Sequence, residues 1–224
     1  MHSFKTASEA FHSLYWHIVR DGIDFAGTKA LFNVGFEIQR PSYKSIHDSK
    51  IKRNWSEKYA EAEWQWYLSG DRNIAKLGEL YGKVPEIWKR MSDCNGDVNS
   101  NYGWQWQRNS QLEMVIENIK QNPETRQAAI SIYDGKEIIT YAFDTPCTYA
   151  VQFTVIDNKL NMSVVMRSND LWYGFCNDQY QFSSLQELVA RETGYSVGTY
   201  YHFAHNLHLY NDKLPEDKTR RFHK

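Results

Sequence analysis

The chain has 224 residues and a formal net charge of −1, so its length suits one domain and its charge gives no basic excess for binding nucleic acid. No apolar run approaches the roughly 20 residues that cross a membrane, and the N-terminal region lacks the apolar core of a signal peptide. The 3 cysteines are widely spaced and form no CxxC pair, which argues against a disulfide framework and a structural zinc site. These properties predict a cytoplasmic protein without a metal.

The first half of the chain has mostly helical periodicity. Apolar residues recur at helical spacing over residues 8–20, 56–68 and 110–121, and the third segment stops at Asn122-Pro123. Between the first two segments, residues 31–38 alternate weakly and predict a strand. Residues 39–54 are polar, contain Pro41 and predict a loop.

From residue 128 onward the period changes to that of strands. Residues 128–133, 138–143, 148–156 and 160–167 predict strands, and Asp157-Asn158 predicts the turn between the last two. Residues 178–192 predict a long helix that ends near Gly194, and residues 200–209 predict a final strand. Because no repeat or long linker interrupts this order, the sequence predicts one α+β domain over residues 1–224.

The segment from Met166 to Asp178 is rich in residues suited to ligand binding. Arg167 and Ser168 suit a phosphate group, because a guanidinium fork and a hydroxyl both match phosphate oxygens. Asp178 stands where this loop leads into the predicted helix. It is therefore either a carboxylate that recognises a ligand or an ordinary N-cap.

Cys147 follows Pro146 at the start of a predicted strand. Most lone cysteines are small buried apolar residues, whereas a nucleophilic cysteine needs a nearby cation to lower its pKa. Arg167 shares one face of its strand with Asn161, Ser163 and Val165, so it could point away from the core and toward such a thiol.

Glu63 lies on the apolar stripe of its predicted helix, four residues after Tyr59. Carboxylates are rarely buried without a partner, so Glu63 either reaches the edge of the stripe or is a buried acid with a raised pKa. His208 and Tyr210 lie two residues apart and face the same side of a strand. They are either a pair that holds a sugar hydroxyl or two half-exposed aromatic residues.

From about Glu63 to Tyr210, the chain resembles the thymidylate synthase superfamily. The order and approximate spacing of the landmarks agree with that superfamily, and within it residues 99–104 and 166–170 are most similar to the phage-type deoxycytidylate hydroxymethylase branch. The landmarks are Glu63 with Trp66-Tyr67-Leu68-Ser69-Gly70-Asp71, Ile87-Trp88, Asn101-Tyr102-Gly103-Trp104-Gln105-Trp106, Asn122-Pro123-Glu124-Thr125-Arg126, Pro146-Cys147, Gln152-Phe153, Arg167-Ser168-Asn169-Asp170 and His208-Leu209-Tyr210.

The resemblance implies a fold, a reaction and an assembly. The fold is a mixed β-sheet flanked by helices, with one sheet face forming the interface of a homodimer. In the reaction, Cys147 attacks C6 of a pyrimidine nucleotide, and C5 takes a one-carbon unit from 5,10-methylenetetrahydrofolate. Similarity to the hydroxymethylase branch implies that the substrate is dCMP. If a phage encodes the chain, the protein is expected in the cytoplasm of the host.

The resemblance also implies roles for individual residues. Glu63 manages protons and ordered water around C5, and Tyr102 helps to remove the C5 proton. The other implied roles are phosphate binding by Arg167, Ser168 and the partner subunit's Arg126, substrate binding by Asn169, fixing of the deoxyribose 3′-hydroxyl by His208 and Tyr210, and folate binding by Trp88, Asp170 and Gly174.

Position 178 predicts the base. Eleven residues after the motif arginine, the thymidylate enzymes carry an asparagine that reads uracil, and this chain has Asp178. An aspartate suits cytosine because it accepts from the N4 amino group and repels O4 of uracil. The adjacent Asn177 leaves open a slip of one residue, although Gly174 holds the expected spacing of seven from Arg167.

Several positions depart from the family pattern. Thr148 follows the nucleophile where thymidylate synthases usually carry histidine, and Gln127 replaces a second arginine after Arg126. The N-terminal phosphate-loop arginine has no clear counterpart, and Gly27-Thr28-Lys29 is expected to replace it, with Lys29 as the cation. The segment after Tyr210 is expected to be a short or altered form of the family's lid-like tail.

Three other functions stay open. A dCMP 5-methyltransferase would differ in the last step, where tetrahydrofolate donates a hydride, and a thymidylate synthase would use dUMP with an unusual Asp178. The third is an inactive homologue that binds nucleotide or RNA, against which the intact set of Cys147, Glu63 and Arg167 argues. Ser168 and Arg126 favour dCMP over CMP only weakly.

Overall fold

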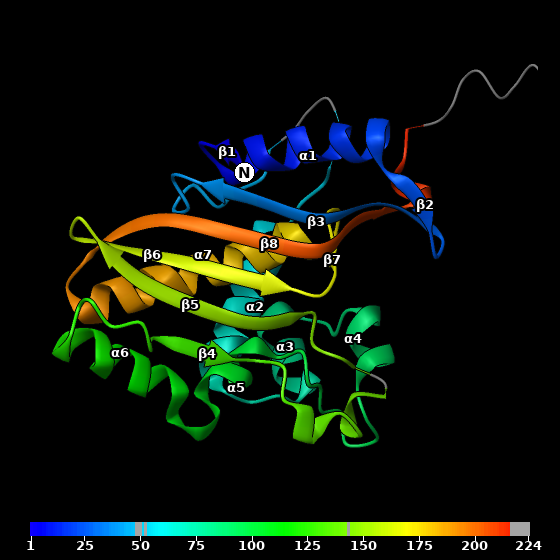
Figure 1. Cartoon of the computed structure of the whole chain (residues 1–224). Coiled ribbons are helices and arrows are strands. Elements are labelled where there is room, and N and C mark those ends of the chain that lie inside the picture. The colour runs from blue at the N-terminus through cyan, green and yellow to red at the C-terminus, as the bar shows by residue number, and fades with distance from the viewer. Residues whose placement is uncertain (48–50, 52, 143, 216–224) are drawn as a thin grey trace, which may run out of the picture.

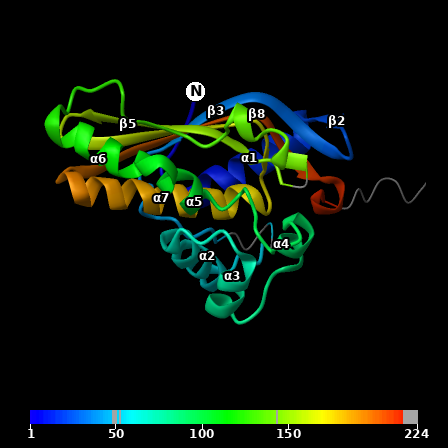
Figure 2. The ribbon, with the colours of Figure 1, turned by 90° about the horizontal axis from the view of Figure 1, so that it is seen from below.

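The computed structural model describes residues 1–47, 51, 53–142 and 144–215. One curved sheet has helices packed on one of its faces, and its other face is left open (Figures 1 and 2). The strands run in the order β1-β3-β8-β6-β5-β4, with β2 paired to β3 and β7 paired to β8. Parallel and antiparallel pairs both occur, since β6 and β8 are parallel whereas β3 and β8 are antiparallel. The predicted α+β class with a mixed sheet flanked by helices is confirmed.

The described residues form the following elements. The strands are β1 (His2–Phe4), β2 (Ile23–Phe25), β3 (Thr28–Ile38), β4 (Ala129–Ser131), β5 (Thr148–Ile156), β6 (Lys159–Met166), β7 (Asn169–Asp170) and β8 (Ser196–Tyr210). The α-helices are α1 (Ala7–Asp21), α2 (Glu57–Ser69), α3 (Ile74–Tyr81), α4 (Glu86–Met91), α5 (Tyr102–Gln107), α6 (Gln111–Gln121) and α7 (Gly174–Thr193).

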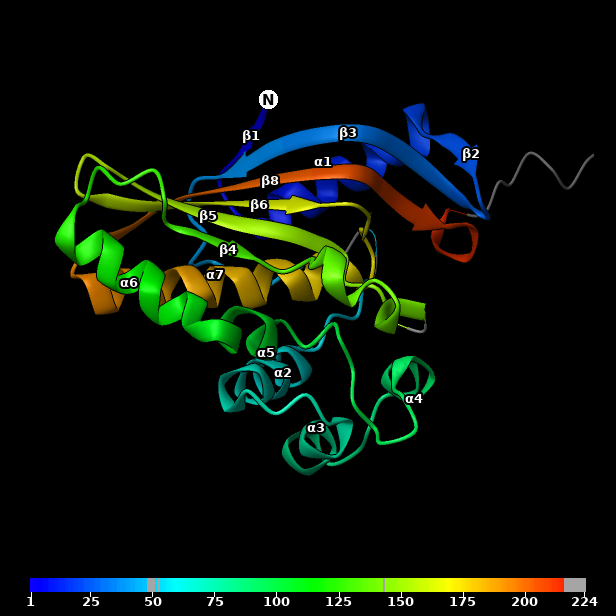
Figure 3. The same cartoon turned by 60° about the horizontal axis from the view of Figure 1, so that its bottom comes forward.

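Helix α7 lies between the sheet and helices α2 and α3, whereas α1 packs on the same face of the sheet beside α7 (Figures 2 and 3). Phe182, Leu185 and Val189 are fully buried on it, and Gly194 ends it in the left-handed conformation with φ 79°. On the far side of α7, α2 and α5 touch backbone to backbone, because a Cβ on Gly103 would lie 1.9 Å from the carbonyl oxygen of Tyr67. No described helix is both long and apolar enough to cross a membrane.

The β5–β6 hairpin agrees with its prediction. Asp157 and Asn158 have φ of 50° and 59°, the left-handed pair that a two-residue hairpin turn requires. Alternate residues of β6, from Leu160 to Met166, are buried under the helices. At the end of the ladder the N–H of Arg167 donates to the carbonyl of Cys147 at 2.8 Å. The hairpin therefore brings these two residues side by side.

Two expectations about the second half of the chain are wrong. Residues 138–143 form no strand where they are described, since 3-10 turns lie at Gly135–Glu137 and Thr140–Ala142. Ile138 and Ile139 are 57% and 87% exposed, so this apolar run lacks the buried face that would stabilise a strand. The final helix begins at Gly174 instead of residue 178, and Asp178 therefore lies inside it and is not its N-cap.

The short elements β1, β2, β7, α3, α4 and α5 were not predicted, because each gives too few residues for a periodic pattern. The loop predicted over residues 39–54 has no regular element in its described part. The segment after residue 215, with its expected lid-like tail, lies outside the described residues.

Candidate active site

Cys147 and Arg167 form a direct pair at the end of the β5–β6 hairpin. The Nη2 of Arg167 lies 3.6 Å from the Sγ of Cys147 and also donates to the carbonyl of Thr145 at 2.7 Å. The Nε of Arg167 donates to the carbonyl of Pro146 at 3.0 Å. The guanidinium is thus held by the backbone just before the cysteine, as the strand alternation predicts.

The surroundings of Cys147 nevertheless favour the protonated thiol. Burial raises its pKa to about 11, whereas the charge of Arg167 lowers it by a smaller amount, and the carboxylates of Asp178 and Asp144 raise it further. Among the named contributions, only the charge of Arg167 favours ionisation of this thiol.

Asp178 is fixed by Asn169. The Nδ2 of Asn169 donates to the Oδ2 of Asp178 at 2.7 Å, from β7 to α7. Gly174 gives this bond its space, because a Cβ there would lie 3.1 Å from Nδ2 of Asn169 and 3.3 Å from Oδ2 of Asp178. Burial raises the pKa of Asp178 well above its ordinary value, the charge of Glu63 raises it further, and the bond from Asn169 lowers it.

Asn177 has other partners. Its Oδ1 accepts from Nε1 of Trp55 at 3.0 Å, and its Nδ2 donates to the carbonyl of Tyr173 at 3.2 Å. Both polar atoms of the Asn177 side chain are thus engaged in hydrogen bonds within the protein.

Glu63 is buried, with 3% of its surface exposed. Its Oε1 accepts from the hydroxyl of Tyr59 at 2.6 Å, and its Oε2 accepts from Nε2 of Gln181 at 3.0 Å. The Tyr59 hydroxyl in turn accepts from Nε1 of Trp88 at 2.7 Å. Burial raises the pKa of Glu63 to about 7, against the lowering by its two hydrogen bonds. Of the two alternatives for Glu63, the structure supports the buried acid.

Tyr102 is the first residue of α5 and is 4% exposed. Its pKa is raised well above its ordinary value by burial and then by the charges of Asp178 and Cys147. Both charges therefore disfavour ionisation of the Tyr102 hydroxyl.

The residues that follow Arg167 contact the end of β8. Asp170 is opposite His208 in the β7–β8 ladder, and its oxygens accept from the N–H groups of Trp172 at 3.0 Å and Tyr173 at 2.9 Å. The His208 and Tyr210 rings meet edge to face with centroids 5.4 Å apart, and Nδ1 of His208 is 2.8 Å from Oδ1 of Asn206. His208 and Tyr210 therefore share a face, as predicted.

Lys29 is not brought to this site. In the β3–β8 ladder Thr28 pairs with Tyr210, Ala30 with His208 and Lys29 with Leu209. Because directly paired residues share a face and neighbours alternate, Lys29 points to the opposite face from His208 and Tyr210. A Cβ on Gly22 would lie 3.1 Å from Cγ of Lys29, which places the lysine against the end of α1. The structure gives no support to Lys29 as the phosphate-binding cation.

Arg126 also lies apart from the thiol within the subunit. It lines a pocket with Thr125, Gln152 and Thr154 beside β5. Gln152 and Thr154 alternate with the buried Val151 and Phe153, so this pocket opens on the sheet face that carries no helix.

Sequence reasoning missed three residues of the site. Tyr59 and Gln181 are the hydrogen-bond partners of Glu63, and Asp144 is a buried carboxylate three residues before Cys147. The spacing of Tyr59 four residues before Glu63 was a usable signal. Nothing in the sequence indicates that Gln181 contacts Glu63 or that Asp144 is buried near Cys147. No three described His, Cys, Asp or Glu side chains are placed to share a metal ion.

The end of the β5–β6 hairpin thus pairs a cysteine with an arginine, and the buried Glu63, Asp144 and Tyr102 are further titratable residues of the candidate site. The sequence model of the thymidylate synthase family matches residues 19–221. The chain belongs to the thymidylate synthase family.

Two curated relatives are both named thymidylate synthase. The protein of Fusobacterium nucleatum subsp. nucleatum is 36% identical over 168 residues, which cover 71% of this chain and 59% of the relative. The protein of Corynebacterium aurimucosum is 30% identical over 164 residues, which cover 70% of this chain and 60% of the relative. The chain thus matches about three fifths of the length of these relatives.

Proposed function

We propose that the chain transfers a folate-borne one-carbon unit to C5 of a cytosine nucleotide and converts dCMP to 5-hydroxymethyl-dCMP. One observation supports cytosine as the base: Asp178 places a carboxylate inside α7, where Asn169 of β7 donates a hydrogen bond to it. Because Asp178 lies inside α7, four residues after its first residue Gly174, it does not serve as the N-cap of this helix. Family membership supports the reaction class.

Asp178 suits the base of dCMP in two ways. With Oδ2 fixed by Asn169, Oδ1 is left to accept from the N4 amino group of cytosine. A carboxyl group with a raised pKa also suits proton exchange at N3 of the ring, which gains electron density when C6 is attacked. Opposite O4 of uracil, an ionised Asp178 would present a second acceptor and repel it.

In the first step the Sγ of Cys147 forms a bond to C6, the C5–C6 double bond breaks, and its electron pair moves toward N3. The thiol releases its proton to solvent, and N3 takes a proton from the carboxyl group of Asp178. Arg167 stabilises the negative charge that develops on sulfur. Glu63, with a pKa near 7, can give and take protons at neutral pH, and Tyr59 links it to Trp88. Tyr102 is assigned a supporting role in the removal of the C5 proton.

The three residues proposed to hold the folate, Trp88, Asp170 and Gly174, differ in the groups that they can offer to it. Folate supplies the one-carbon unit when it is bound. Each oxygen of Asp170 accepts one backbone N–H, which leaves further lone pairs for an N–H of a pterin. Trp88 offers its ring but not its N–H, which donates to Tyr59. Gly174 acts indirectly here, because it makes room for the Asn169–Asp178 bond.

The nucleotide phosphate is proposed to lie between two subunits, bound by Arg167, Ser168 and the partner's Arg126. The open sheet face carries Val165, Tyr201 and Phe203, which line a hollow on it. A second copy packed on this face would cover these apolar side chains. Arg126 lies in a pocket beside the same face, where it can reach a partner.

A second candidate is methylation of dUMP. It is favoured by the names of both relatives, which are thymidylate synthases. A dCMP 5-methyltransferase would use the same site as the proposed enzyme. In methylation, tetrahydrofolate donates a hydride to the one-carbon group in the last step, whereas in hydroxymethylation water adds to that group.

One assay separates these functions. The protein is incubated with 5,10-methylenetetrahydrofolate and each of dCMP, CMP and dUMP, and the products are identified by mass. We expect 5-hydroxymethyl-dCMP from dCMP and little product from dUMP. Transfer of tritium from C6 of the folate into the product would instead identify a methyltransferase. The absence of product from all three nucleotides would refute the proposal in favour of an inactive binding homologue.

A further inference from the structure

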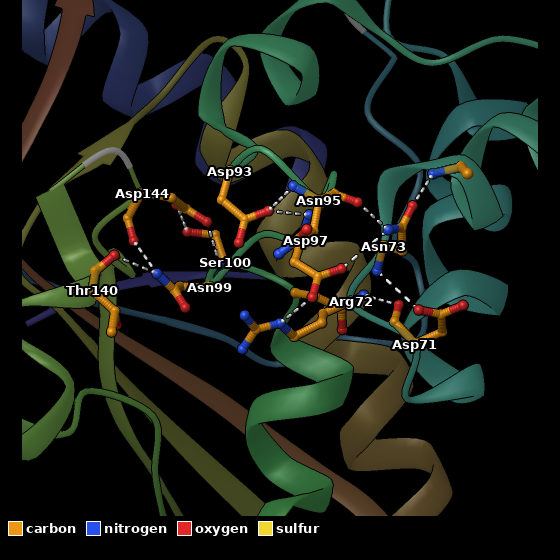
Figure 4. A network of polar contacts seen from close by, with 12 residues as sticks. Asp71, Arg72, Asn73, Asp93, Asn95, Asp97, Asn99, Ser100, Thr140 and Asp144 are labelled. Carbon is orange, nitrogen blue, oxygen red and sulfur yellow. Dashed lines mark hydrogen bonds and ion pairs between the residues drawn. The ribbon is translucent and has the colours of Figure 1, made fainter.

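Asp144 is a buried carboxylate three residues before Cys147, and the proposed reaction gives it no task. Its surface is 2% exposed, and it begins the segment whose next two carbonyls bind Arg167. Both of its oxygens accept from one residue, Ser100: the N–H of Ser100 donates to Oδ2 at 2.6 Å, and the Ser100 hydroxyl donates to Oδ1 (Figure 4).

The chain around Ser100 leads directly to Tyr102. Asn101 caps α5 by accepting from the N–H of Trp104 at 2.8 Å, and Tyr102 is the next residue. On the other side of Ser100, the Nδ2 of Asn99 donates to the carbonyls of Thr140 at 3.1 Å and Asp144 at 3.2 Å. Residues 99 and 100 are thus bound to residues 140 and 144 by hydrogen bonds from both side chains (Figure 4).

Tyr102 and Glu63 belong to one tightly packed unit. Gly103 of α5 touches the carbonyl of Tyr67 of α2, and Nε2 of Gln107 donates to the same carbonyl at 3.0 Å. Cys147 and Arg167 belong instead to the end of the β5–β6 hairpin. Asp144 and Ser100 join the two units.

We propose that Asp144 is a positioning residue that holds the Tyr102 hydroxyl in register with the Cys147 sulfur through its paired hydrogen bonds to Ser100. The inference rests on the proposed function, in which Cys147 and Tyr102 act on one pyrimidine ring. A displacement of about 1 Å in such a pair costs on the order of 100-fold in rate. Two bonds accepted by one buried carboxylate fix both distance and orientation, because hydrogen bonds weaken steeply when they are bent.

The charge of Asp144 has a separate effect on the thiol. It raises the pKa of Cys147, although burial and the charges of Arg167 and Asp178 act on that pKa more strongly. Removing the charge at 144 should therefore ease ionisation of the thiol even while turnover falls. Loss of the Ser100 hydroxyl should reduce turnover without this change in charge.

The test compares Asp144→Asn, Ser100→Ala and the double variant with the control Asp134→Asn. Asp134 lies in the same loop and is also bonded, accepting from Arg108 at 3.0 Å and from the N–H of Lys136 at 3.0 Å. With dCMP and the folate, we expect kcat to fall about 10- to 100-fold in both single variants, with nucleotide KM within about threefold. The double variant should be no slower than the slower single variant, because both changes break one interaction. Asp134→Asn should keep the wild-type kcat.

Alkylation of Cys147 by iodoacetamide without substrates gives the second measurement. The plot of alkylation rate against pH should move to lower pH in Asp144→Asn, because the charge that raises the pKa of the thiol is gone. It should stay unchanged in Ser100→Ala and Asp134→Asn. A deuterium isotope effect at C5 of dCMP should increase in both single variants, because proton removal then limits the rate more strongly.

Wild-type kcat in either single variant, or losses that multiply in the double variant, would overturn the positioning role. If Asp144→Asn shows no cooperative thermal unfolding, Ser100→Ala decides alone, through its kcat and its isotope effect. A wild-type protein that makes no product from any of the three nucleotides would refute the proposed function instead, and that result is obtained before any variant is measured.

Discussion

The Nδ2 of Asn169 donates to the Oδ2 of Asp178 at 2.7 Å, and this bond joins the short strand β7 to helix α7. It fixes one carboxylate oxygen, and the proposed function assigns the other to the base of the nucleotide. The Oδ1 of Asn169 is buried and has no hydrogen-bond partner among the described residues, so the amide keeps one acceptor beside the same carboxylate. Base recognition by Asp178 is therefore expected to depend on a residue nine positions before it.

Replacement Asp178→Asn should shift preference from dCMP toward dUMP. An amide can donate to O4 and accept from N3–H, whereas a carboxylate can only accept. An unfavourable contact of the buried carboxylate with O4 costs on the order of 2–4 kcal/mol, so the ratio of kcat/KM values should change roughly 30- to 1,000-fold. Asn177→Ala is the matched control and should keep the wild-type preference. If the wild type uses dUMP as well as dCMP, or Asp178→Asn keeps its cytosine preference, the assignment of the substrate fails.

Replacement Arg167→Gln should make the thiol of Cys147 less reactive. The charge of Arg167 lowers the pKa of that thiol, so its loss should raise the pKa further. The pH profile of iodoacetamide alkylation should therefore move to higher pH. Arg191→Gln, which removes an exposed cation on α7, is the control. An unchanged profile in Arg167→Gln would show that the guanidinium does not stabilise the thiolate.

Replacement Glu63→Gln should remove a pH dependence of stability. The folded protein raises the pKa of Glu63 from 4.5 to about 7, so between these values the folded state binds more protons than the unfolded state. This group therefore makes the protein less stable as pH rises from 4.5 to 7, by up to about 1.4 kcal/mol per pH unit. Denaturant unfolding at several pH values measures the slope, with the exposed Glu61→Gln as control. An identical slope in Glu63→Gln and the wild type would show that Glu63 ionises normally.

Replacement Cys147→Ser should abolish turnover and leave dCMP binding largely intact, because a hydroxyl is a far weaker nucleophile than a thiolate at neutral pH. Calorimetric titration with dCMP and a product assay measure the two properties. Activity above a few per cent of the wild type would remove Cys147 from the mechanism.

A shared phosphate site predicts complementation between inactive variants. Arg126→Ala and Cys147→Ser subunits, each inactive alone, should recover activity after mixing and subunit exchange, because a hybrid dimer contains one intact site. Mixing Arg126→Ala with itself after the same exchange treatment is the control. Lack of recovery in hybrids shown to form by mass spectrometry would count against a site shared between subunits.

The sequence by itself determined the elements with long periodic patterns and the residues that carry the family resemblance. Helix α1, helix α6 and the β5–β6 hairpin follow from spacing and from Asp157-Asn158, because those signals depend on neighbouring residues. Alternation along β6 also placed Arg167 toward Cys147. The sequence also identified Cys147 and Glu63 as candidate catalytic residues, but it does not determine the pKa of either side chain.

The tertiary structure decided the environments of these residues. Asp178 became an internal helix residue bonded to Asn169, Glu63 became a buried acid between α2 and α7, and Lys29 was placed on the opposite face from His208. The Asp144–Ser100 bonds join residues 44 positions apart. Burial and hydrogen bonding set a pKa, and both depend on packing between distant segments, which the order of residues along one element does not specify.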